Sequence, residues 1–111
     1  MTDVFKRISA HAFASDLGLD ELRHALTTAG PWSWIERDSG IFGDYISALA
    51  KDDYAVLKVF ATEPGGYQID IRFETSGDDP EREWRELEDD VLHRLLPAVR
   101  ARYLGPTDTM V

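Results

Sequence analysis

Residues 54–74 read YAVLKVFATEPGGYQIDIRFE, and this stretch decides the fold. In its second half apolar residues alternate with polar ones: Tyr67, Ile69, Ile71 and Phe73 against Gln68, Asp70, Arg72 and Glu74. Successive side chains of a strand point to opposite faces, so this run predicts a strand with one apolar face and one polar face. The EPGG segment before it is typical of a hairpin loop. The stretch therefore predicts two antiparallel strands, at 54–62 and 67–74.

The length of the loop sets the expected register of this hairpin. A three-residue loop at 64–66 pairs Glu63 with Tyr67, Val59 with Ile71 and Leu57 with Phe73. The core face then carries Leu57, Val59, Tyr67, Ile69, Ile71 and Phe73. On the opposite face lie Val56, Lys58, Phe60, Asp70 and Arg72. Because Val56 and Phe60 are apolar, we expect either a cover over that second face or a contact surface on it.

Two more strands and a helix precede the hairpin. Strand-like runs at 32–37 and 44–50 are joined by DSGIFG, which reads as a hairpin connection. Leucines at spacings of three and four predict a helix within 15–31, with Ser15, Asp16 or Asp20 as its cap. Gly30 suits a left-handed position after that helix, and the following proline cannot continue it. The apolar residues of 4–13 share a helical face and favour an earlier helical turn.

A second helix follows the sheet. Asp79 as cap, Pro80 in the first helical position and Glu81 near the positive end of the helix all indicate its start. Its wide apolar face is typical of a helix that packs on a sheet. Pro97 has no N–H for the carbonyl of His93, so we expect a kink or break near 96–97.

These elements predict an α+β fold in the order α-β-β-β-β-α. Short loops join the strands, so they form a four-stranded antiparallel meander, with the two helices on one side as a two-layer sandwich. The length of 111 residues predicts one domain over 1–111. We expect a mobile tail over about 105–111, after the last helical residues.

Composition and charge narrow the function classes. Hydrophobic residues make up 43% of the chain and cysteine is absent, so packing and not disulfides or zinc–thiolate sites must stabilise the fold. The net charge of −9 argues against a nucleic-acid partner, because phosphate binding needs clustered lysines and arginines. Residues 78–90 alone hold eight acids against Arg82 and Arg85, which favours a basic partner or simple solvation. No apolar run resembles a signal peptide or membrane span, so we expect a cytoplasmic protein that binds no membrane.

The candidates for chemistry are few. His93 follows Asp89 and Asp90 by four and three residues, which places an imidazole beside a carboxylate on one helix. A metal site or catalytic set needs a third converging group, and the sequence identifies none. Ser39 and Ser47 lack a nucleophile elbow, and SGIFG is not a phosphate-binding loop. We therefore expect no cofactor, no metal and a non-enzymatic role.

Aromatic residues indicate a candidate contact surface instead. Trp32 and Trp34 point to the same side of their strand, either into the core or onto the open face. Tryptophan and tyrosine are frequent anchors at protein interfaces. Together with the polar residues around them, they define the predicted partner-binding set: Trp34, Asp38, Phe42, Asp44, Tyr45, Lys58, Phe60 and Arg72.

Three hypotheses for function remain open at this stage. The first is a small acidic protein-binding module of the immunity or inhibitor type, which engages a basic protein. The second is a homodimer that associates through the uncovered sheet face around Val56 and Phe60. The third is a small-ligand carrier or enzyme with a pocket between sheet and helices, using His93 or His24.

Overall fold

The protein is described here by a computed structural model, which describes residues 4–30, 32–38, 40, 43–49 and 55–108. In chain order the elements are β1 (Phe5–Ala14), α1 (Leu19–Ala29), β2 (Ser33–Asp38), β3 (Asp44–Leu49), β4 (Ala55–Glu63), β5 (Gly66–Thr75), α2 (Pro80–Asp90), the π-helical turn η1 (Val91–Leu95), α3 (Leu96–Ala98) and β6 (Arg102–Thr107). α2, η1 and α3 follow one another without a gap and form one continuous helical stretch.

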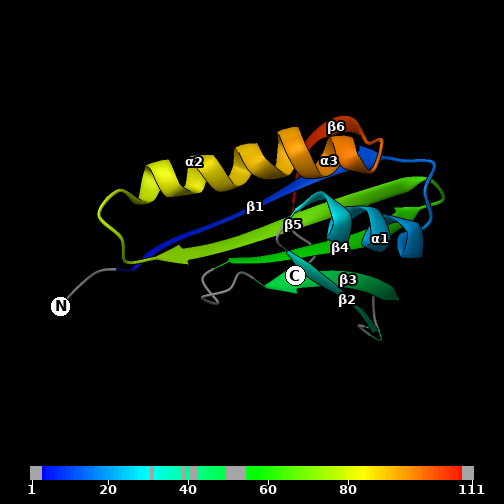
Figure 1. Cartoon of the computed structure of the whole chain (residues 1–111), viewed down its shortest axis with the longest axis horizontal. Helices are drawn as coiled ribbons and strands as arrows, with labels where there is room; N and C mark the ends of the chain where they lie inside the picture. Colours follow the sequence, from blue (N-terminus) through cyan, green and yellow to red (C-terminus); the bar gives the residue numbers. More distant parts are fainter. Residues whose placement is uncertain (1–3, 31, 39, 41–42, 50–54, 109–111) are drawn as a thin grey trace.

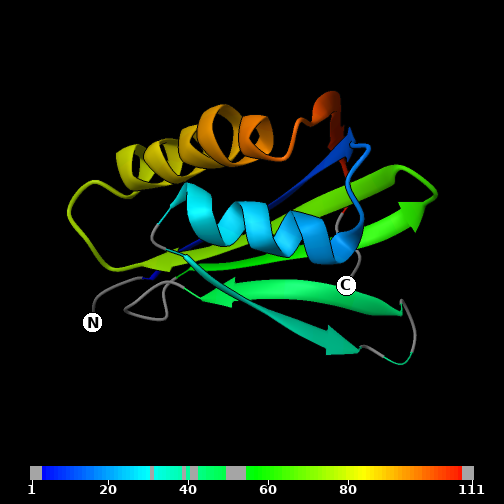
Figure 2. The ribbon, with the colours of Figure 1, turned by 45° about the vertical axis from the view of Figure 1, so that its right-hand side comes forward.

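All strands belong to one antiparallel sheet in the order β2-β3-β4-β5-β1-β6. Both helical stretches lie on the same side of it, so the fold has one helical layer and one sheet layer (Figure 1; Figure 2). The predicted α+β class and the antiparallel meander β2 to β5 are confirmed. The predicted count of four strands is wrong, because β1 and β6 extend the sheet to six.

β1 occupies a segment in which the apolar spacing favoured a helical turn. Residues 5–13 fit the helical period as well as the two-residue period of a strand. In the strand, the odd-numbered residues, among them Phe5, Ser9 and Phe13, point to one face and the even-numbered residues to the other. β1 pairs with β5 over its whole length, from Phe5 opposite Thr75 to Ala14 opposite Gly66. That long-range pairing decides between two local patterns of similar strength.

The β4–β5 hairpin forms where the sequence predicts it, but with a different register. Glu63 lies opposite Gly66, Val59 opposite Ile69 and Leu57 opposite Ile71. The loop therefore has two residues, Pro64 and Gly65, and a bulge between Ala61 and Glu63 absorbs the difference. Gly65 has a φ of 78°, and proline followed by a glycine of positive φ is typical of a type II turn. Between Ala55 and Ala61 the register moves by two residues, so these side chains keep their predicted face; beyond the bulge Glu63 moves by one residue and changes face.

The core lies between the sheet and the helical layer. Its buried apolar side chains come from both: Phe13, Trp34, Ile46, Leu57, Val59, Ile69, Ile71 and Phe73 from strands, and Leu22, Leu26, Trp84, Val91, Leu95, Leu96 and Val99 from helices. Leu57, Val59, Tyr67, Ile69, Ile71 and Phe73, the predicted core face, are all buried. This layer holds α1 and α2 against one side of the sheet.

The predicted ends of α1 need correction. Gly18, and not Ser15, Asp16 or Asp20, occupies the cap position, and its N–H donates to the Glu21 carboxylate at 3.2 Å. Ser15 instead donates to the Val99 carbonyl at 2.7 Å. Gly30 is extended, with φ −165°, and not left-handed. A side chain there would approach the Arg94 guanidinium at 2.9 Å, so close packing explains this glycine.

The second helical stretch begins as predicted and changes form before the proline. Asp79 caps α2 by accepting from the Arg82 N–H at 3.3 Å, with Pro80 in the first position. Val91 accepts from the Leu96 N–H, the i→i+5 bond of a π-turn, directly before Pro97. The helix ends at Ala98, where Arg100 adopts φ 55° and Ala101 N–H donates to the Leu96 carbonyl at 3.0 Å. These bonds form a Schellman-type stop with arginine in the left-handed position.

β6 follows this stop and pairs with the outer edge of β1. Residues 105–107, where we expected the tail to start, form part of this pairing, and 109–111 lie outside the described residues. Within the described ranges, no helix combines the length and apolar character needed to cross a membrane.

Candidate protein-binding surfaces

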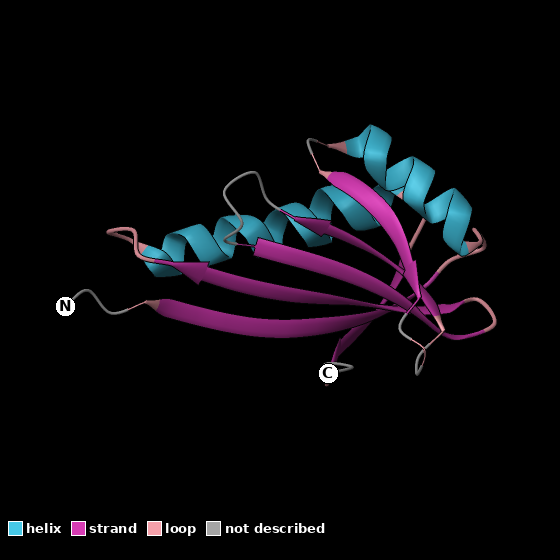
Figure 3. Ribbon diagram, turned by 90° about the horizontal axis from the view of Figure 1, so that it is seen from below, coloured by secondary structure: helices cyan, strands magenta, loops and turns pink. Residues whose placement is uncertain are grey.

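The open face is the side of the sheet opposite the helices; Figure 3 shows it in front of α2. Strand register arranges its side chains in three rows that run across the strands. The outer row holds Ser33, Leu49, Val56, Arg72 and Ile8. The middle row holds Ile35, Ser47, Lys58, Asp70 and Ala10. The inner row holds Arg37, Tyr45, Phe60, Gln68 and Ala12.

Burial differs sharply between the two ends of the open face. In the inner row Phe60 is only 3% exposed, and its ring stacks on Tyr45 with centroids 4.9 Å apart. In the outer row Leu49 and Ile8 are each 53% exposed. One end of this face is therefore covered and the other presents exposed apolar side chains, and the contact surface expected there stays a prediction.

The C-terminal end of the described chain contributes to the covered end. The Asp108 carbonyl accepts from Gln68 Nε2 at 2.7 Å, and Gln68 lies on β5, beyond β1 as seen from β6. Asp108 therefore lies over the open side of the sheet, where the backbone has crossed from β6 past β1 toward β5. Three alanines of β1 point to that side: Ala10, Ala12 and Ala14. Their small side chains leave room for the crossing backbone.

The structure divides the predicted partner-binding set between the two sides of the sheet. Tyr45, Lys58, Phe60 and Arg72 share the open face, with the Lys58 ammonium 5.8 Å from the centre of the Tyr45 ring. Trp34 is 4% exposed and packs in the core opposite Ala48, so its proposed place on the open face is corrected. Asp38 and Asp44 lie opposite each other at the hairpin end, on the same face of the sheet as Trp34 and therefore away from the open face. Phe42 lies outside the described residues.

The periodicity of the β2–β3 pair places Trp34 and Tyr45 on opposite faces of the sheet. Tyr45 lies opposite Arg37, whereas Trp34 lies opposite Ala48, three residues further along β3. Odd and even positions point to opposite faces, so Trp34 and Tyr45 cannot share one. The large apolar area of an indole is also favoured in the core beneath α1.

The outer surface of α2 and the residues directly before it form a second candidate surface, the acidic helix surface, defined by the exposed residues Asp78, Glu81, Glu86 and Asp89. Two of these four acids form ion pairs with arginines. Arg82 pairs with Glu86 at 3.1 Å, and Arg7 from β1 pairs with Glu81 at 3.1 Å. The surface therefore keeps an excess of negative charge after its own ion pairs are formed.

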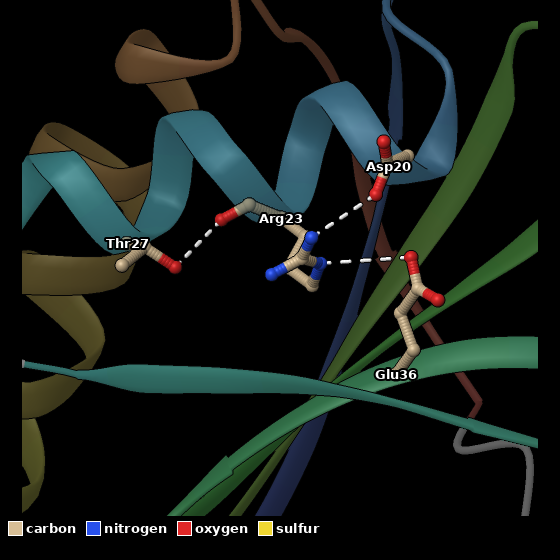
Figure 4. Close-up of polar contacts among 4 residues, drawn as sticks. All are labelled: Asp20, Arg23, Thr27 and Glu36. Carbon is tan, nitrogen blue, oxygen red and sulfur yellow. Dashed lines mark hydrogen bonds and ion pairs between the residues drawn. The ribbon is translucent and has the colours of Figure 1, made fainter.

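α1 joins this helical layer to the edge strand β2 through Arg23. Its guanidinium lies 3.2 Å from the Asp20 carboxylate and 3.5 Å from that of Glu36 on β2, and its own carbonyl accepts from the Thr27 hydroxyl (Figure 4). The hydrogen bond from Arg23 holds the pKa of the Asp20 carboxyl below its ordinary value. These contacts are exposed, so they orient α1 more than they stabilise it.

A buried polar cluster around His11 is absent from the sequence-based predictions. The His11 ring is 5% exposed, with Nδ1 2.8 Å from the Tyr103 hydroxyl of β6. Its Nε2 lies 3.4 Å from the Ser9 hydroxyl and 3.5 Å from the Glu88 carboxylate of α2. The cluster links β1, β6 and α2, three elements far apart in the sequence, so no spacing between its residues could have revealed it.

The geometry of this cluster fits a structural role, in which polar contacts join β1, β6 and α2, better than a catalytic relay. Ser9 and Glu88 share one ring nitrogen, whereas a Ser–His–acid relay needs them on opposite nitrogens. Burial raises the pKa of the Tyr103 phenol above its ordinary value, and the Glu88 carboxylate raises it further. A raised pKa disfavours the phenolate that nucleophilic attack would need. The pocket hypothesis gains no support from these contacts.

The histidine pair predicted on the second helix takes a different form. Asp90 forms a two-point ion pair with Arg94, with both N–O distances 2.6 Å, and His93 is exposed on the surface. His24 is exposed as well. Neither histidine is buried between sheet and helices, and the described residues include no group of three or more His, Asp or Glu that could hold a metal ion.

Comparison with known proteins adds no family. No protein-family model matches the chain, and no curated protein is significantly similar to it. The two surfaces therefore rest on their own geometry and charge.

Proposed function

We propose that the protein is a small non-enzymatic protein-binding module that engages a basic protein through the acidic helix surface, in the manner of an immunity or inhibitor protein. The observation that carries this proposal is the gathering of exposed acids on α2, namely Glu81, Glu86 and Asp89, with Asp78 directly before the helix. Neighbouring arginines neutralise only part of that charge.

The physical reason is electrostatic steering. A patch of one sign raises the local concentration of an oppositely charged partner and speeds its association. The net charge of −9 acts in the same direction over distances up to the Debye length, about 8 Å at physiological salt. A basic partner would therefore approach the helical side first.

Affinity capture from cells of the source organism, followed by mass spectrometry and association kinetics, tests this proposal. We expect a basic protein whose on-rate falls steeply with salt. The triple variant Asp78→Asn, Glu86→Gln and Asp89→Asn should slow association, while Asp79 stays intact because it caps α2. Glu74→Gln, an exposed acid of β5, is the matched control and should leave the rate unchanged. An on-rate independent of salt would contradict the proposal.

The alternative is a homodimer through the open face, favoured by the exposed apolar side chains of Leu49 and Ile8 and the half-buried Val56 beside them. Light scattering should then give twice the monomer mass, and Leu49→Glu should return it to the monomer. Phe60→Glu is unsuitable as a test, because Phe60 is buried and its loss would unfold the protein. A monomer at high concentration would exclude this alternative.

A further inference from the structure

The arginines of the molecule differ in whether an acid neutralises them. On the helical side Arg7, Arg23, Arg82 and Arg94 each form an ion pair. On the open face neither Arg37 nor Arg72 pairs with an acid within the described part of the chain. Exposed Arg85 of α2 likewise forms no ion pair within the described residues, so Arg37 and Arg72 are distinguished by their place on the open face and not by the lack of an acid alone.

The open face has a charge opposite to that of the whole protein. Its described side chains include five cations, Lys6, Arg37, Lys58, Arg72 and Arg102, against the acids Glu63, Asp70 and Glu74. Asp70 is buried and accepts from Gln68 Nε2 at 2.7 Å, and Glu74 pairs with Lys6 at 3.8 Å. The accessible charge of the outer and middle rows is therefore positive.

These cations lie among exposed apolar side chains. Arg72 stands between Val56 and Ile8 in the outer row, and Lys58 stands one row further in, between Ser47 and Asp70. Arg37 lies on β2 two residues from Ile35, which is exposed on the same face. Aliphatic contacts flanked by guanidinium groups offer a partner both apolar area and carboxylate-binding donors.

We propose that the outer and middle rows of the open face, together with Arg37 at the edge of the inner row, dock an acidic, amphipathic segment of a partner protein. Arg72, Lys58 and Arg37 would receive its carboxylates, and Leu49, Val56 and Ile8 its apolar side chains. A nucleic-acid backbone is a poorer occupant, because three cations on a protein of net charge −9 give little counterion release. This surface lies on the other side of the sheet from the acidic helix surface, so the inference does not depend on the proposed function.

A matched pair of synthetic peptides tests this inference. Both are labelled amphipathic peptides with one leucine pattern; the first carries glutamate and the second lysine at the polar positions. Fluorescence anisotropy should show the glutamate peptide binding to the full chain. Arg72→Glu and Arg37→Glu should each weaken that binding by about fivefold or more, since a like charge now faces the peptide.

The control separates the local charge from the total charge. Arg85→Glu changes the net charge equally, but on exposed Arg85 of α2, and should leave glutamate-peptide binding within about twofold of the wild type, because exposed charges beyond a Debye length are screened. Circular dichroism verifies that each variant is folded. Equal weakening by Arg85→Glu and Arg72→Glu, or binding of neither peptide, would overturn the inference. A wild-type dimer that Leu49→Glu dissociates would also overturn it, since the occupant would then be a second copy.

Discussion

The helical side and the open side of the sheet use the same strands in different ways. Toward the helices, Trp34, Leu57 and Ile71 are buried, and four arginines around them are paired with acids. Away from the helices, Leu49 and Ile8 are exposed, and Arg72 lies between Val56 and Ile8 with no ion pair among the described residues. The difference teaches that strand alternation buries the side chains that face the helices, whereas on the open side burial depends on the row: Phe60 is buried and Leu49 and Ile8 are exposed.

The largest expected effect compares one residue from each side. Trp34→Ala should lower the free energy of unfolding by about 3–5 kcal/mol, because it opens a cavity beneath α1. Leu49→Ala on the open face should change it by less than about 0.5 kcal/mol, because that side chain is half exposed. Urea denaturation of both variants measures the contrast. A similar loss in the two variants would break the comparison.

Phe60 sharpens the comparison within the open face. Although it points away from the helices, it is buried and stacked on Tyr45. Phe60→Ala should therefore destabilise the protein by about 3 kcal/mol, close to a core substitution. Val56→Ala in the outer row should cost clearly less. Thermal unfolding followed by circular dichroism measures both, and a Phe60→Ala variant as stable as Val56→Ala would show that the inner row is not a core.

Arg100 provides a smaller test on the helical side. Its φ of 55° at the end of α3 is a left-handed conformation that costs a non-glycine residue about 1 kcal/mol. Arg100→Gly should raise the free energy of unfolding by up to about 1 kcal/mol, after the extra flexibility of glycine in the unfolded chain is subtracted. Arg102→Gly, in the extended strand β6, serves as the control and should destabilise instead. The opposite signs are measurable by urea denaturation.

The smallest expected effect is a loss of unfolding free energy at alkaline pH. Burial raises the pKa of Tyr67 and of Tyr103 above the ordinary 10.0, with further contributions from Glu21 and Glu88 respectively. The folded state therefore favours the neutral phenols. Their contribution is fully present below pH 10 and is lost as the pH rises through the raised folded values. The free energy of unfolding should fall over this range, and the double variant Tyr67→Phe and Tyr103→Phe should fall less steeply. Equal slopes would contradict these pKa directions.

Sequence patterns were sufficient for the elements whose local signals agree. β5 alternates without interruption, and Asp79-Pro80 marks the start of α2, so both were predictable. β1 was not, because Phe5 to Phe13 fits two periodicities and only pairing with β5 decides between them. β6 is short and contains Gly105 and Pro106, which read as the end of ordered structure. Its pairing with β1 is a tertiary contact that no local pattern records.

The residues of the candidate surfaces also fall into those that the sequence could place and those that it could not. The shared face of Lys58 and Arg72 follows from alternation within one hairpin and was predictable. Arg37 joins them only through the register of β2 on β3, which also turns Trp34 inward. The His11 cluster needs β1, β6 and α2 together, so sequence spacing could not reveal it.

The central claim is that the two sides of the molecule present opposite charges to partners. An NMR titration of the full chain with the glutamate peptide, and separately with the lysine peptide, tests it most directly. The glutamate peptide should shift the methyl signals of Ile8, Leu49 and Val56, whereas the lysine peptide should shift the amide signals of Glu86 and Asp89 on α2. Perturbation of the same surface by both peptides would contradict the claim.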